Sequence, residues 1–178
     1  SGDYLQVYTY QLGIALPLHM LAKLFSGVTM EQLDFLAQCV NAALGIAGAG
    51  VLAALAQELL DRRAASATLL LYIASLPTLL LTQFVYNINL MILLGAGATL
   101  CFARYARTGR AGFGLAYAAL AGLATVAKPN AEIVLLALLI CALLHGWANR
   151  DVKIVLFAAL SFAIGKGAFA AVAAWYGK

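Results

Sequence analysis

Residues 64–103 read AASATLLLYIASLPTLLLTQFVYNINLMILLGAGATLCFA and contain no charged residue. A transmembrane helix needs roughly 20 predominantly apolar residues, so this stretch is long enough for two. Gln83, Asn87 and Asn89 interrupt it near its middle. We predict two membrane-spanning helices, joined at the membrane surface by a polar turn, QFVYNIN, at residues 83–89.

The composition of the chain also favours a membrane protein. Of its 178 residues, 65% are hydrophobic and 10% are charged, and the mean hydropathy is +0.95. A soluble domain carries about 25% charged residues. A water-soluble helical protein does not fit, because no expected helix keeps a polar face. The basic residues form no dense patch interleaved with aromatic residues, so nucleic acid is not an expected partner, whereas membrane lipids are.

Charged residues divide the chain into six expected spans. We predict an all-α polytopic membrane protein. Residues 1–34 would form an external loop with an interfacial amphipathic helix, and residues 35–178 a transmembrane helical domain. The predicted spans cover about residues 35–57, 64–82, 87–103, 111–127, 133–149 and 154–176.

The basic residues predict the orientation of these spans. Seven of them occupy alternate loops, whereas Lys23, Lys128 and Lys178 fall on the other side. Cytoplasmic loops carry an excess of Lys and Arg, so residues 1–34, 83–89 and 128–132 are expected to share the external face. The seven residues on the cytoplasmic side are Arg62, Arg63, Arg104, Arg107, Arg110, Arg150 and Lys153.

The first external segment combines tyrosines with an amphipathic stretch, LPLHMLAKLF at residues 16–25. It is too interrupted to span a bilayer, and we expect it to lie at the interface. It either anchors the chain there through its aromatic residues or contributes to a binding site. Glu31 and Asp34, which follow it, are expected to cap the next helix and open its first turn.

Two lysines stand out near the external side. In TVAKPNAEIV, residues 125–134, Lys128 and Glu132 are four apart and are expected to pair on one helical face. A lysine beside a helix N-terminus favours phosphate, although it is also typical of an interfacial helix end. Lys166 falls near the middle of the last predicted span, where a lysine costs about 2.5–3.5 kcal/mol. It is expected to face a cavity or a partner, unless the span tilts and the side chain reaches the surface.

The order of several motifs resembles the membrane-embedded GT-C glycosyltransferases. The similarity is to bacterial proteins related to protein O-mannosyltransferases and to the aminoarabinose transferase acting on lipid A. It covers most of the chain, but each motif is short, and GIALPLH has one proline where the family usually has two. The motifs are YQLGIALPLHMLAKLF at residues 10–25, YNIN at 86–89, RYARTGR at 104–110 and LAGLATVAKPN at 120–130.

The resemblance implies an enzyme of the bacterial inner membrane with a periplasmic active face. It would move a sugar from a polyprenyl-phosphate donor to an acceptor lipid, glycan or protein. The family's catalytic acid precedes the GIALPLH segment, so we expect it to be Asp3 or an acid upstream of Ser1. No metal-ligand spacing is visible in the sequence, and a need for a divalent metal stays open.

The transfer reaction suggests roles for further residues. Displacing a lipid phosphate requires a base for the acceptor and positive charge against the leaving phosphate. We expect Lys128 and Lys166 to hold that phosphate. The residues expected to line the substrate cavity are Tyr8, Tyr10, His19, Asn87, Asn89 and Asn130.

Two other functions fit the same sequence. A transporter would also carry an isolated intramembrane lysine, and would place it where broken helices meet near the midplane. A non-catalytic membrane subunit would pack against a partner through its Gly- and Ala-rich faces. Because the chain begins at Ser1 and ends directly after an apolar run, we also expect it to be the middle portion of a longer protein.

Overall fold

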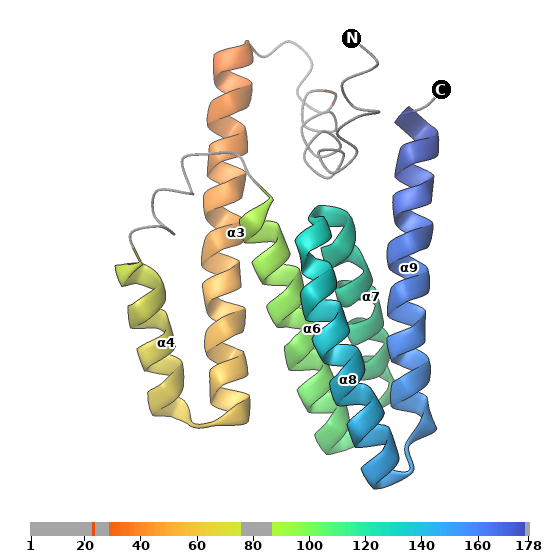
Figure 1. Cartoon of the computed structure of the whole chain (residues 1–178). Helices are drawn as coiled ribbons and strands as arrows, with labels where there is room; N and C mark the ends of the chain where they lie inside the picture. The colour runs from red at the N-terminus through yellow and green to blue at the C-terminus, as the bar shows by residue number, and fades with distance from the viewer. Residues whose placement is uncertain (1–22, 24–28, 76–86, 177–178) are drawn as a thin grey trace.

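The computed structural model describes residues 23, 29–75 and 87–176. In these residues consecutive long helices run in opposite directions and form a bundle (Figure 1). Helix α3 packs against α4 and α6, α6 packs against α7, α7 packs against α9, and α8 packs mainly against α9. The elements are α3 (Met30–Leu59), α4 (Arg62–Ala74), α6 (Ile88–Thr108), α7 (Ala111–Ala127), the 3-10 helix η2 (Pro129–Ala131), α8 (Glu132–Asn149) and α9 (Val152–Tyr176).

Local sequence signals account for several helix ends. Thr29 begins α3 with a capping box, in which its hydroxyl accepts from the Gln32 backbone N–H and the Gln32 side chain accepts from the Thr29 N–H. The Asp61 carboxylate accepts from the Ala64 N–H at 2.7 Å and caps α4. Gly109, with φ of 65°, ends α6 in the left-handed conformation that glycine adopts without strain.

Small residues fill many of the contacts between helices, and many large apolar residues point outward. Ala98, Ala118 and Ala142 are fully buried, whereas the exposed fractions of Leu70 and Trp147 are 68% and 88%. A soluble helical protein buries its large side chains. A membrane protein instead packs through small residues and turns its large apolar ones toward lipid. This distribution indicates a bundle whose outer surface faces acyl chains.

In the described part of the chain, four helical segments are long and apolar enough to cross a membrane, namely Glu31–Leu59, Ile88–Thr108, Pro129–Asn149 and Val152–Ala171. Helix α7 is equally apolar but shorter. The chain is therefore an all-α polytopic membrane protein, as the sequence predicted. Helix α4 covers the first part of the predicted 64–82 span, and residues 76–86 lie outside the described part. The separation of residues 1–34 from the helical domain stays a prediction.

Three details of the prediction are wrong. Helix α3 begins at Met30 and its cap is Thr29, so Glu31 is not the cap but lies in the first turn, and Asp34 lies beyond that turn. Asp34 accepts a hydrogen bond from the Gln38 side chain, one turn further along α3. Asn89 was expected in a surface turn, but α6 begins at Ile88 and contains it.

Candidate functional site

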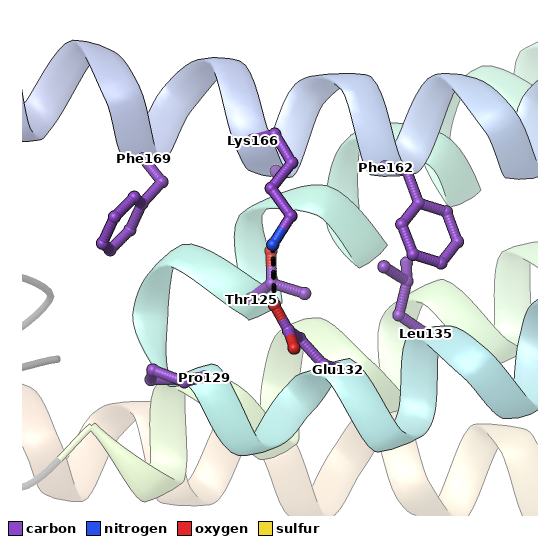
Figure 2. A pocket seen from close by; sticks show the side chains of 8 residues that line it. Thr125, Pro129, Glu132, Leu135, Phe162, Lys166 and Phe169 are labelled. Carbon is purple, nitrogen blue, oxygen red and sulfur yellow. Dashed lines mark hydrogen bonds and ion pairs between the residues drawn. The ribbon is translucent and has the colours of Figure 1, made fainter.

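A cavity of about 140 Å³ lies where α7 ends and α8 begins. It is bounded by α7, η2, α8 and α9, and Figure 2 shows the side chains that surround it. Most of the lining is apolar, with one lysine and one glutamate facing each other across it. The lining residues are Thr125, Pro129, Glu132, Leu135, Phe162, Gly165, Lys166 and Phe169.

The charged pair joins α9 to the first residue of α8. Lys166 Nζ donates to Glu132 Oε1 at 3.2 Å. Both side chains remain accessible, with exposed fractions of 76% and 58%. Such an exposed pair contributes little to stability, but it orients the ammonium group over the cavity. A lysine ammonium has three donors, so it can contact an anionic ligand while it keeps the contact with Glu132.

Two glycines set the position of Lys166. A Cβ atom added at Gly165 would lie 2.6 Å from Thr125 Oγ1 and 3.3 Å from the Gly122 carbonyl oxygen. A Cβ atom added at Gly122 would lie 2.8 Å from the Ser161 carbonyl oxygen. Helices α7 and α9 therefore approach each other closely at this level, and Lys166 follows the contact directly.

Lys166 lies near the middle of α9 (Val152–Tyr176), as predicted, and its contact with Glu132 places it level with the start of α8. The prediction that Lys128 and Glu132 share a helical face is wrong, because α7 ends at Ala127 and η2 intervenes before α8. Figure 2 shows the side chain of Lys166 reaching from α9 toward Glu132.

Lys128 and Asn87 both lie at the end of α7. Lys128 ends α7, and its backbone N–H donates to the Ala124 carbonyl at 3.0 Å. The Asn87 side chain donates to the Ala127 carbonyl at 3.1 Å and so satisfies one of the last carbonyls of α7. Pro129 occupies the first turn of η2. Asn130 is exposed on η2, and neither it nor Lys128 is among the cavity-lining residues.

Asn89 lies elsewhere. It is 3% exposed, and its side-chain nitrogen donates to the backbone and side-chain oxygens of Asn41, both at 3.2 Å. Asn41 belongs to α3 and is itself buried. The amide of Asn89 therefore joins α3 to α6, and Asn89 is not among the residues that line the cavity at Lys166.

Four of the predicted site residues, Asp3, Tyr8, Tyr10 and His19, lie outside the described residues. Within residues 23, 29–75 and 87–176, no group of three or more His, Cys, Asp or Glu side chains could hold a metal ion.

The sequence analysis missed Glu132 as the partner of Lys166. The two residues are 34 positions apart, so no local pattern connects them. One signal was available, since both lie at similar distances from the charged turn at Arg150 and Asp151. In an antiparallel helix pair, equal distances from the turn place two residues at the same level.

The sequence matches the family described as dolichyl-phosphate-mannose-protein mannosyltransferase over residues 15–175. No curated protein and no solved structure matches the chain. The family match covers most of the sequence and agrees with the apolar helical bundle. The chain therefore belongs to the dolichyl-phosphate-mannose-protein mannosyltransferase family, a family of GT-C membrane glycosyltransferases that use polyprenyl-phosphate sugars as donors.

Proposed function

We propose that the cavity under Lys166 and Glu132, together with the adjoining end of α7, forms part of the donor site of a polyprenyl-phosphate glycosyltransferase. The sugar would pass to an acceptor lipid, glycan or protein on the external face, which in a bacterial inner membrane is the periplasmic face. The observation that carries this proposal is a lysine held by a glutamate over an apolar cavity where α7 ends and α8 begins.

The apolar part of the cavity lining suits the prenyl chain of the donor, and the charged part suits its phosphate. Leu135, Phe162 and Phe169 offer an apolar surface of the kind a prenyl chain requires. Lys166 offers a positive charge of the kind a lipid phosphate requires. Lys128, which is half-buried at the end of α7, supplies a second lysine on the same side of the bundle.

The positive charges of Lys166 and Lys128 would act in the transition state of the transfer. Transfer breaks the bond between the sugar and the phosphate oxygen, so negative charge accumulates on the phosphate as the acceptor bond forms. Lysines aimed at that phosphate stabilise the developing charge. A carboxylate takes the proton from the acceptor, and Asp3 is the candidate for this role. Tyr8, Tyr10, His19 and Asn130 are candidates for contacts with the sugar or the acceptor.

Transfer assays on variants of Lys166 test the proposal. The purified full-length protein in liposomes is incubated with radiolabelled polyprenyl-phosphate sugars, and release of label from the lipid is followed. Losing one charge-stabilising donor typically lowers kcat by about 10²–10³, and we expect a loss of this size in Lys166→Ala and in Lys128→Ala. Lys153→Ala, which removes an exposed lysine near the opposite end of α9, is the matched control and should react at the wild-type rate.

The possible outcomes test the role of Lys166 and the proposed transfer activity separately. Wild-type transfer by a folded Lys166→Ala protein would exclude Lys166 from the donor site. Absence of transfer from every donor tested, in a wild-type protein that is folded and inserted, would contradict the proposed activity itself.

A further inference from the structure

A second hollow lies where α3 and α6 end and α7 begins. Figure 1 shows that these helix ends lie away from the level where α7 ends and α8 begins. The volume of the hollow is about 420 Å³. Because it lies far from Lys166 along the helices, it is not part of the proposed donor site. The residues that line it are Glu58, Arg104, Arg107, Thr108, Arg110 and Phe113.

The lining carries more positive than negative charge. Three guanidinium groups surround one carboxylate. Glu58 Oε2 accepts from Arg104 Nε at 3.4 Å, and Glu58 Oε1 accepts from Arg107. One carboxylate thus bridges two arginines. Together, the three guanidinium groups and this carboxylate carry a formal charge of +2. The Arg104 and Arg107 side chains keep exposed fractions of 42% and 67%, so both remain accessible to a ligand.

The turn between α6 and α7 brings the third arginine to the hollow. Gly109 ends α6 in the left-handed conformation, and the Arg110 N–H donates to Thr108 Oγ1 at 3.4 Å. The guanidinium carbon of Arg104 lies 5.9 Å from the centre of the Phe113 ring, which supports it from the α7 side. The arginines before and after the turn therefore border one space.

We propose that this hollow binds the phosphate of an anionic phospholipid headgroup. Guanidinium groups match the oxygens of phosphate as they match those of carboxylate. The bridging carboxylate of Glu58 shows that anionic oxygens fit between Arg104 and Arg107. Basic pockets at the cytoplasmic ends of transmembrane helices are suited to such headgroups, and this end carries the excess of basic residues.

The surface beside the hollow favours a lipid over a free phosphate ion. Leu59 and Leu60 directly follow Glu58, and their exposed fractions are 60% and 76%. These side chains offer an exposed apolar surface for acyl chains near the end of α3, which borders the hollow through Glu58. A phospholipid would therefore place its phosphate in the hollow and its acyl chains against these leucines. This inference is independent of the proposed donor site.

Native mass spectrometry of the purified full-length protein tests the site. The protein in nonionic detergent is titrated with phosphatidylglycerol or with phosphatidylcholine of the same acyl chains. Each arginine near the membrane surface contributes about fivefold in affinity. Arg107→Gln/Arg110→Gln should therefore weaken phosphatidylglycerol binding about thirtyfold. Arg62→Gln/Arg63→Gln removes two exposed arginines at the same end but outside the hollow, and should bind as the wild type does.

A second variant covers the case in which losing the Arg107–Glu58 pair unfolds the protein. Glu58→Gln keeps all three arginines and removes the carboxylate that competes for them, so it should bind phosphatidylglycerol about fivefold more tightly. Unchanged or weaker binding by this variant would overturn the proposal. So would equal weakening by the two arginine double variants, or equal wild-type affinities for the two lipids. Displacement of bound phosphatidylglycerol by excess inorganic phosphate at constant ionic strength would identify free phosphate as the ligand and overturn the lipid assignment.

Discussion

Asn89 and Lys166 are both polar residues within apolar helices, and their surroundings give them different roles. Asn89 is buried and donates to two oxygens of Asn41 on the neighbouring helix. A buried amide with interhelical partners stabilises helix contact in lipid. Lys166 is exposed beside a cavity and contacts one carboxylate. Only the second arrangement leaves a charged group where a ligand can reach it.

The role of Asn89 predicts a loss of stability in Asn89→Ala. Removing its amide leaves buried oxygens of Asn41 without that donor, which should destabilise the contact between α3 and α6 by about 1–2 kcal/mol. Unfolding of the full-length protein by sodium dodecyl sulfate in mixed micelles, followed by circular dichroism, measures the change. Asn130→Ala removes an exposed amide and is the matched control.

A double-mutant cycle isolates the pair itself. The coupling between Asn41→Ala and Asn89→Ala should be about 0.6 kcal/mol, the average for interhelical hydrogen bonds in a membrane protein. Strictly additive effects would show that the two amides do not stabilise each other.

At the scale of the elements, the contact between α7 and α9 depends on the absence of side chains. Gly165 faces Thr125 and the backbone of Gly122 at distances that leave no room for a Cβ atom. Gly167, on the same helix, has nothing within 4 Å of its added Cβ atom. Both glycines lie within α9, but only Gly165 has a second helix packed against it.

The same substitution at the two positions should therefore have opposite effects. Gly165→Ala should destabilise the protein by about 1–3 kcal/mol, because Thr125 or the whole of α9 must move. Gly167→Ala should be neutral or stabilising by up to about 1 kcal/mol, because alanine has the higher helix propensity. Detergent unfolding midpoints of the two variants measure the difference. Equal midpoints would mean that α9 does not pack closely on α7 at Gly165.

The helices themselves could be predicted from the sequence, because charged residues interrupt the apolar runs near the observed helix ends. The first residue of α3 could have been predicted from Thr29 and Gln32, whose spacing is typical of a capping box. The partners of Asn89 and Lys166 could not, because hydrogen bonds across 48 and 34 residues depend on which helices become neighbours. The region of the candidate site could therefore be predicted from the sequence, whereas its Lys166–Glu132 pair is visible only in the structure.

At the scale of the whole molecule, the two ends of the bundle differ in charge. One end carries Glu58 with Arg104, Arg107 and Arg110 in a basic hollow. The other end carries the cavity bounded by Lys166 and Glu132. If the basic end is cytoplasmic, the proposed donor site opens on the external side, as an enzyme that acts outside the cytoplasm requires.

Labelling at the two ends of one segment tests this orientation. Asn130 on η2 and Asn149 at the end of α8 are both exposed and lie at opposite ends of a candidate span. Each is replaced by cysteine in a background in which Cys39, Cys101 and Cys141, all free thiols, are alanine. A membrane-impermeant maleimide should label Asn130→Cys in intact spheroplasts, and Asn149→Cys only after permeabilisation. The reverse pattern would place the basic end outside and contradict an external donor site. Labelling of both cysteines in intact spheroplasts would show that the segment does not cross the membrane.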